Sequence, residues 1–221
     1  MTTEPPVAPG AGEEGTRGAA GLFDALGLTY EEVFGQEPGL LAMIDWLLAR
    51  LPAGAKVMDI GSGTGRPAAA RLAAAGHHVT GYDISPVMVA LARRRVPAAS
   101  FELRDVRDLP DTPGEWDGIA ALFSLLTMSR ADISATLTRI ATWLVPGGLL
   151  AFATAPFDVE DIEFEWMGHL ARGSSYPAEA YPRLLREAGL EVLREDRAVF
   201  HPDFPGMNAE EHLFIYARKP G

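Results

Sequence analysis

The chain has 221 residues, a formal net charge of −11, 48% hydrophobic and 22% charged residues, and no cysteine. These values fit one globular domain with enough apolar residues for a core, and the lack of cysteine excludes disulfides, thiolate metal sites and cysteine nucleophiles. The acidic balance disfavours binding to nucleic acid, because neutralising phosphates needs a surface of Lys and Arg. We therefore expect a small-molecule partner and no nucleic acid.

The first twenty residues form a segment of their own. Residues 1–20 are rich in Gly, Ala, Pro and Glu, which predicts a disordered tail. They lack the basic start and apolar core of a signal peptide, and no apolar run in the chain is long enough to cross a bilayer. We expect a cytoplasmic protein without a membrane partner, folded as a single domain over residues 21–221.

After the tail, helices come first, and then strands and helices alternate. Helical periodicity runs irregularly from Gly21 to Gly35, and a second helix is predicted over 38–51. Strands are expected at 56–60, 78–82, 99–104, 116–122 and 147–154, with helices near 64–75, 86–95 and 130–143. This alternation predicts a parallel sheet that is covered by helices on both faces.

The last part of the chain has a different pattern. Residues 155–176 show no clear strand and carry five acidic residues, namely Asp158, Glu160, Asp161, Glu163 and Glu165. A helix is expected over 178–188, followed by strands over 190–200 and 211–218. Two strands joined without a helix indicate one antiparallel strand at the edge of the sheet.

The most informative segment is VMDIGSGTG at 57–65, where an apolar strand meets glycines at every second position. A dinucleotide-binding turn has its third glycine three positions after the second, which here is Arg66; the glycine stands at Gly65 instead. Asp59 would repel a pyrophosphate and attract an ammonium group. The turn therefore favours a ligand with an amino acid end and a nucleoside end, such as S-adenosylmethionine (SAM).

Four ordered segments together resemble the class I SAM-dependent methyltransferases: VMDIGSGTG, VTGYDISPVMVALA, FELRDVRDLP, and WDGIAALFSLLTM followed by LVPGGLLAFAT. The resemblance runs from Tyr30 to the C-terminus, apart from the variable insert. It implies a Rossmann-like α/β fold with a seven-stranded, mostly parallel sheet, helices on both faces and an antiparallel last strand. Arg66 and Pro67 stand where many members of the family have apolar residues. Similar GTGRP segments occur in bacterial small-molecule enzymes of the family.

The resemblance also implies a cofactor site for SAM, with S-adenosylhomocysteine (SAH) as product. It places Asp59 near the methionine ammonium, Gly61 at the amino acid part, Asp83 at both ribose hydroxyls and Asp105 at the adenine amino group. Phe123, with Ser124, would flank the transferred methyl. The full set of implied cofactor residues is Tyr30, Asp59, Gly61, Ser62, Gly63, Gly65, Asp83, Ile84, Met88, Asp105, Val106, Phe123 and Ser124.

The five histidines show no spacing typical of zinc ligands, so we expect no metal. His77 and His78 are expected in a surface turn, and His212 near solvent or at an edge. His169 lies where this fold places elements that cover the acceptor, and a neutral imidazole there could take a proton from a hydroxyl or amine. The alternative for His169 is a partly buried residue with a minor helical pairing to Glu165.

These observations predict a SAM-dependent methyltransferase that acts on O or N of a small molecule, with secondary metabolites among the candidate acceptors. The helices of 21–51 and the insert 155–176 are expected to cover the acceptor site. Two alternatives stay open: a protein of this fold that binds SAM without methyl transfer, for instance to guide a cyclisation, and, less favoured, an NAD(P)-dependent oxidoreductase. A monomer and a homodimer both fit the sequence.

Overall fold

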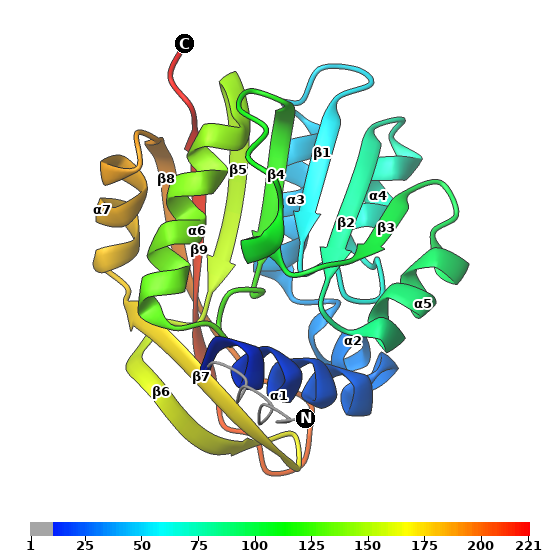
Figure 1. Ribbon diagram of the computed structural model, residues 1–221, viewed down its shortest axis with the longest axis vertical. Coiled ribbons are helices and arrows are strands. Elements are labelled where there is room, and N and C mark those ends of the chain that lie inside the picture. Colours follow the sequence, from blue (N-terminus) through cyan, green and yellow to red (C-terminus); the bar gives the residue numbers. More distant parts are fainter. Residues whose placement is uncertain (1–10) are drawn as a thin grey trace, which may run out of the picture.

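The computed structural model describes residues 11–221, and its centre is a sheet of seven strands (Figure 1). The strands, in the order in which they lie side by side, are β3 (Ser100–Leu103), β2 (His78–Asp83), β1 (Lys56–Ile60), β4 (Trp116–Leu122), β5 (Leu144–Thr154), β9 (Glu210–Arg218) and β8 (Glu191–Phe200). Neighbours from β3 to β5 pair in parallel, whereas β9 is antiparallel to both β5 and β8. The predicted sheet and its antiparallel last strand are confirmed.

The antiparallel strand does not lie at the edge, so that prediction is wrong. β9 lies between β5 and β8, and β8 forms the edge. Residues 213–217 of β9 are all buried, which suits a strand with both faces covered. β8 is mostly exposed and carries alternating charges, which is typical of an edge strand because charges there discourage pairing with another chain.

Helices cover both faces of the sheet, as predicted. One face packs against α3 (Pro38–Leu48), α4 (Ala68–Ala74) and α5 (Pro86–Arg95), and the other against α6 (Arg130–Trp143) and α7 (Ala180–Glu187). Successive strand residues enter opposite cores: Val57 lies in the first and Met58 in the second. A short 3₁₀ helix, η1 (Val106–Asp108), follows β3.

The remaining elements form a layer that we call the cap. It consists of α1 (Ala11–Leu26), α2 (Leu28–Phe34), β6 (Phe157–Trp166) and β7 (His169–Pro177). In Figure 1 the cap lies across the ends at which β1, β4 and β5 point, with α1 beside β7. Leu22 and Leu26 of α1 pack with Phe34, Met167 and Ala171 in a core separate from those of the sheet.

The cap corrects two predictions. Residues 11–20, expected as part of a disordered tail, belong to α1, while residues 1–10 of that tail lie outside the described residues. The insert 155–176, expected without strands, forms the antiparallel pair β6 and β7. Its alternating acidic and aromatic residues place Glu163 and Phe164 on opposite faces of the pair, and Met167 and Gly168 (φ 51° and 76°) form its turn.

No helix in the described part of the chain is long and apolar enough to cross a membrane.

Candidate functional site

A cavity of about 760 Å³ lies between the cap and the carboxyl ends of the parallel strands. Parallel strands bring their carboxyl ends to one edge of a sheet, where ligands of open α/β folds bind. All of the cofactor residues expected from the sequence line this cavity except Gly65, namely Tyr30, Asp59, Gly61, Ser62, Gly63, Asp83, Ile84, Met88, Asp105, Val106, Phe123 and Ser124. The structure therefore brings together residues that are far apart in the sequence.

The glycine turn after β1 is shaped by close packing on two sides. Gly61, Gly63 and Gly65 have φ of 66°, 51° and 79°, a region that other residues rarely adopt. A Cβ at Gly61 would lie 2.3 Å from the Ser124 Cβ, and one at Gly65 would lie 3.0 Å from Phe101. A Cβ at Gly63 would meet no protein atom within 4 Å, so the turn is open at Gly63, which lines the cavity. Gly65 does not line the cavity and instead packs closely against Phe101 and Val96.

Asp83 ends β2 and orients the turn toward the cavity. Its Oδ2 accepts a hydrogen bond from the Gly63 N–H and its Oδ1 from the Ser85 N–H, each at 2.8 Å. The residue is 8% exposed, and burial raises the pKa of this carboxyl, opposed by the backbone hydrogen bonds. Each carboxylate oxygen can accept more than one hydrogen bond, so Asp83 retains capacity for a ligand hydroxyl.

Asp59 is a buried carboxyl on the cavity wall. It is 3% exposed, and burial, followed by the charge of Asp83, raises its pKa to about 7, although a hydrogen bond from the Ala69 backbone lowers it. No basic side chain of the described residues forms an ion pair with it. A cationic group of a ligand would stabilise the ionised form of Asp59.

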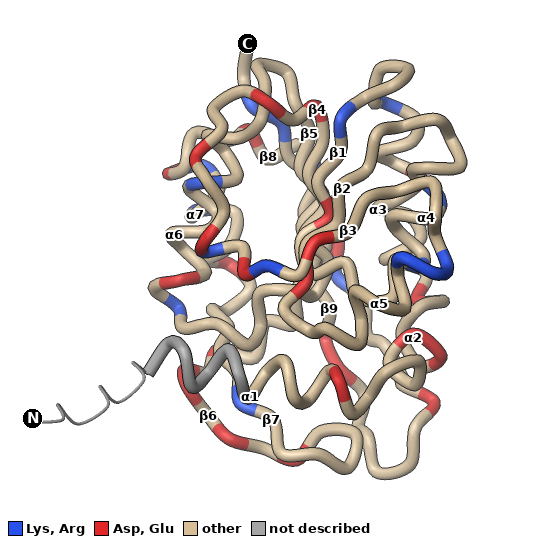
Figure 2. Tube along the Cα trace, turned by 45° about the vertical axis from the view of Figure 1, so that its right-hand side comes forward, with Lys and Arg blue, Asp and Glu red and all other residues tan. Residues whose placement is uncertain are grey.

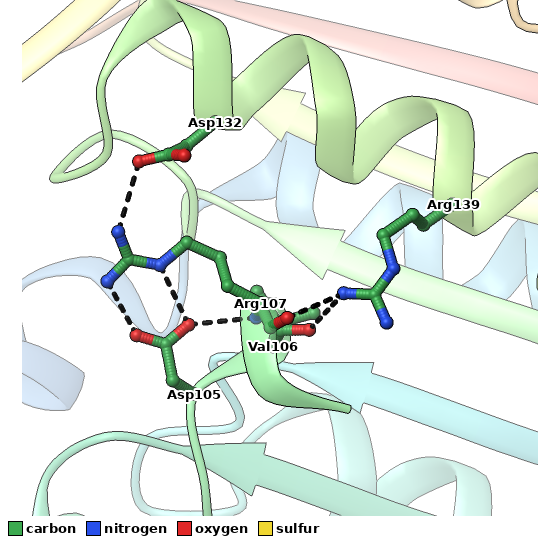
Figure 3. A network of polar contacts seen from close by, with 5 residues as sticks. All are labelled: Asp105, Val106, Arg107, Asp132 and Arg139. Carbon is green, nitrogen blue, oxygen red and sulfur yellow. Dashed lines mark hydrogen bonds and ion pairs between the residues drawn. The ribbon is translucent and has the colours of Figure 1, made fainter. Parts of the chain in front are cut away.

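Asp105, expected at the adenine, belongs to a charge network that the sequence did not predict (Figure 3). Its Oδ1 accepts from the backbone N–H and the Nε of Arg107 at 2.9 and 3.0 Å, and its Oδ2 from Nη2 at 2.7 Å. Arg107 also donates to Asp132 of α6 at 3.0 Å. From the same helix, Arg139 donates to the carbonyl oxygens of Val106 and Arg107, which ties η1 to α6.

Tyr30, Phe123 and Ser124 also line the cavity. Tyr30 packs on Phe34, with ring centroids 5.2 Å apart, and burial is the largest cause that raises its pKa above the ordinary value. Phe123 follows β4 with φ of 58°, a left-handed conformation that is costly for a bulky residue. The Ser124 Oγ is buried and has no hydrogen-bond partner among residues 11–221, so it is a polar atom available to a ligand.

Two acidic residues of the cap bind the glycine turn and α5, and no pattern in the sequence predicted either contact. Asp24 of α1 accepts hydrogen bonds from the Ser85 Oγ and the Val87 N–H at the start of α5. Glu31 of α2 accepts from Thr64 in the glycine turn and, at 2.7 and 2.8 Å, from both terminal nitrogens of Arg95. The cap is thus held to the glycine turn and to both ends of α5.

The histidines differ most from expectation. His169 is exposed at the β6 to β7 turn and does not line the cavity, so the geometry does not support it as a base. His77 and His212, expected near solvent, are 7% and 2% exposed, so those predictions are wrong. His212 is buried because β9 is an interior strand of the sheet.

Comparisons with known proteins identify the family of this chain. Residues 57–148 match the model of a family described as a methyltransferase domain. The chain is 32% identical over 163 residues to magnesium-protoporphyrin O-methyltransferase of Rhodobacter capsulatus, which covers 68% of this chain and 70% of that protein. It is 33% identical over 165 residues to methyltransferase GfsG of Streptomyces halstedii, covering 68% of this chain and 59% of that protein.

Solved structures share the fold. The 1,6-didemethyltoxoflavin-N1-methyltransferase of Burkholderia thailandensis, solved with its substrate and SAH, has a TM-score of 0.71 at 24% identity, over 99% of this chain and 94% of that one. The [4+2]-cyclase SpnF has a TM-score of 0.70 at 21% identity, over 93% and 97%. With the relatives above, the strand order and the glycine turn, these matches show that the chain belongs to the class I SAM-dependent methyltransferases, enzymes that use SAM as cofactor.

Proposed function

We propose that this methyltransferase transfers the methyl group of SAM to an oxygen or nitrogen atom of a small molecule bound beneath the cap. The observation that carries the proposal is the cavity itself, which is lined by the cofactor residues on the sheet side and by α1, α2, β6 and β7 on the other. A site enclosed in this way suits a ligand that can be surrounded. Two of the similar proteins are named for small molecules, magnesium protoporphyrin and 1,6-didemethyltoxoflavin.

The residues present fit SAM by three properties. Asp83 offers two acceptor oxygens for the ribose hydroxyls, and Asp59 is a buried carboxyl without a cationic partner in the described chain, which suits the ammonium. The turn is open at Gly63, where a Cβ would meet no protein atom, so a ligand can approach the backbone closely. In this proposal Asp105 and Val106 lie at the adenine, and Phe123 and Ser124 at the methyl.

Chemistry then depends on position more than on a reactive side chain. SAM supplies a methyl group on a positively charged sulfur, which a nucleophile attacks directly from the opposite side. Reactants that are held in line gain effective molarities of about 10⁵ M or more, so no general base is obligatory. We propose that the walls of the cavity hold the acceptor in line and exclude water.

The acceptor end lies where the cap meets α6. Thr127 and Met128 line it from the loop before α6, and Leu170 and Arg172 from β7. Glu160, Asp161 and Glu163 of β6 also line the cavity, and Figure 2 shows β6 as a mainly acidic strand of the cap. Asp161 is paired with Arg172. Of the cover expected from 21–51 and 155–176, we propose that α1, α2 and the insert cover the acceptor site, whereas α3 packs on a face of the sheet.

A screen of small-molecule acceptors tests this function. With SAM present, an acceptor is expected to gain the mass of one methyl group while an equal amount of SAH is released, and mass spectrometry measures both. A protein that binds SAM without methyl transfer would bind SAH but release none with any acceptor. Thermal stabilisation by NADH in place of SAH would contradict the cofactor assignment and return the oxidoreductase alternative.

Replacing His169 by alanine is expected to leave the rate of SAH release and the affinity for SAH within about twofold of the original values. The reason is that exposed substitutions away from a site have small effects, and His169 is exposed and outside the cavity lining. The measurement is the turnover rate with an acceptor found in the screen. A tenfold fall in rate with unchanged SAH affinity would restore His169 as a candidate base.

A further inference from the structure

A buried histidine lies between two carboxylates behind the cavity wall, in a cluster formed by Glu37, His212 and Glu210. Glu37 is the N-cap residue of α3, and His212 and Glu210 belong to β9. The His212 Nδ1 lies 3.0 Å from a Glu37 oxygen, and its Nε2 lies 3.3 Å from a Glu210 oxygen. The side chains of His212 and Glu37 are each 2% exposed, and that of Glu210 is 16% exposed.

The geometry of the cluster indicates the charge of the ring. Both ring nitrogens face carboxylate oxygens, which accept hydrogen bonds and do not donate them when ionised. A neutral imidazole has only one N–H, so one of its nitrogens would direct a lone pair at a carboxylate. The doubly protonated ring satisfies both contacts.

The neighbouring charges act in the same direction. Burial alone would lower the pKa of His212, but the hydrogen bonds to Glu210 and Glu37, and their charges, raise it above the ordinary value. The same carboxylates affect the hydroxyl of Tyr30 in α2. Burial raises its pKa most, followed by the charges of Glu210 and Glu37. Phe123, Phe200 and Phe214, whose rings lie near that of His212, are uncharged.

The ring of His212 is the support against which Phe123 packs. The two ring centroids lie 4.5 Å apart, and on β8 the ring of Phe200 stacks on His212 at 5.3 Å with an interplanar angle of 21°. Phe123 lines the cavity, whereas His212 does not. Because Phe123 has φ of 58°, the surrounding contacts must offset the cost of that conformation. The rings of Phe123 and His212 meet tilted, at an interplanar angle of 52°, and a cationic ring this close to an aromatic ring is one such contact.

We propose that His212, held as a cation by Glu37 and Glu210, is a positioning residue for methyl transfer that fixes the ring of Phe123 against the methyl end of the cofactor. The proposal rests on the proposed function, since it needs Phe123 to lie beside the methyl. It also accounts for a buried ionic cluster, which on energetic grounds alone is no more stable than an apolar core of similar volume.

The test compares affinities for SAM and SAH, measured by calorimetry in the variants Phe123→Ala, His212→Leu and the double variant. SAM and SAH differ by one methyl group and the charge on sulfur, so the ratio of their affinities reports contacts at that end alone. Phe123→Ala and His212→Leu are each expected to change the ratio about fivefold, and the double variant no more than Phe123→Ala, because residues that act through one contact are not additive. His201→Leu, at an exposed histidine, is the matched control and should leave the ratio unchanged.

Two results would overturn the inference. In the first, His212→Leu lowers thermal stability and weakens SAM and SAH equally, which is what a purely structural residue does. In the second, the double variant shows the sum of the two single effects. Asp83→Ala tests the proposed cofactor site separately from the role of His212. Unchanged SAH affinity in Asp83→Ala overturns the proposed cofactor site together with this inference. Lost SAH affinity with an unchanged ratio in His212→Leu overturns this inference alone.

A measurement on the unsubstituted protein covers the case in which His212→Leu does not fold. In ¹⁵N-labelled protein, His212 is expected to keep protons on both ring nitrogens to a higher pH than free histidine does. Replacing His77, His78, His169 and His201 one at a time assigns the remaining one of the five histidine signals to His212. A His212 signal that loses one of these protons at or below the pH at which free histidine does would overturn the proposal.

Discussion

Replacing Asp83 by alanine is expected to weaken the binding of SAH about 100-fold or more. Hydrogen bonds to a charged acceptor contribute about 1.5–3 kcal/mol each, and the carboxylate is expected to accept from two ribose hydroxyls. The substitution also removes the acceptor of the Gly63 N–H, which lies in the turn that faces the ligand. Both losses act on the same binding step, so the effect is expected to be among the largest of any single substitution.

Calorimetry with SAH measures this loss, and thermal unfolding of each variant without ligand shows whether the fold is intact. Asp83→Asn keeps one acceptor oxygen and is expected to fall between alanine and the original residue. Asp45→Ala is a matched control, because Asp45 is an exposed carboxylate of α3 that pairs with Arg71. A folded Asp83→Ala variant whose affinity for SAH changes less than threefold would refute the ribose assignment.

Binding of SAH is expected to release a proton from Asp59. With its pKa raised to about 7 in the ligand-free protein, this carboxyl is largely protonated at pH 6.5. The α-amino group of SAH, with an ordinary pKa of about 8, is charged at that pH and favours the ionised carboxylate. Most of one proton should therefore leave on binding, and affinity should fall as pH decreases below 7, by up to about tenfold per unit.

Calorimetry at pH 6.5 in buffers of different ionisation enthalpy measures the released proton directly. Asp59→Asn should abolish the release and weaken SAH binding about 30-fold or more, since removing one partner of a buried charge pair costs about 2–5 kcal/mol. Equal proton release in the variant and the original protein would show that another group titrates. The raised pKa of Asp59 also affects stability. The folded protein binds more protons at Asp59 than the unfolded protein does, so this group lowers the free energy of unfolding as pH rises from about 4 to about 7.

The residues that we propose hold the cofactor could be placed at one edge of the sheet from the sequence, because their signals are local. Apolar runs mark the strands. Asp59 near the end of β1, Asp83 at the end of β2 and Asp105 after β3 come to one edge of a parallel sheet, whatever the details of packing. Asp59 and Asp83 needed only this rule to be placed together. The glycine turn was equally readable, since its positive φ angles require glycine.

The sequence predicted that segments 21–51 and 155–176 cover the site, but it did not predict the strands β6 and β7 or the start of α1. The alternation in β6 mixes acidic residues with aromatic ones, and its partner β7 contains small and polar residues, so neither has the apolar pattern of a buried strand. The start of α1 was missed because its composition is typical of a disordered tail. The helix is held instead by Leu22 and Leu26, which pack on α2 and on the pair β6 and β7. Such contacts override local preference.

By itself, the sequence determined the sheet of parallel strands, the helices on both faces and the carboxylates that we propose face the cofactor, because each follows from periodicity or from a local turn. Tertiary structure alone decided that β9 lies inside the sheet, that Arg107 engages Asp132 of α6, and that His212 meets Glu37 across 175 residues of chain. These pairings depend on the order and register in which distant strands and helices pack, and no pattern within a short stretch of residues encodes that order.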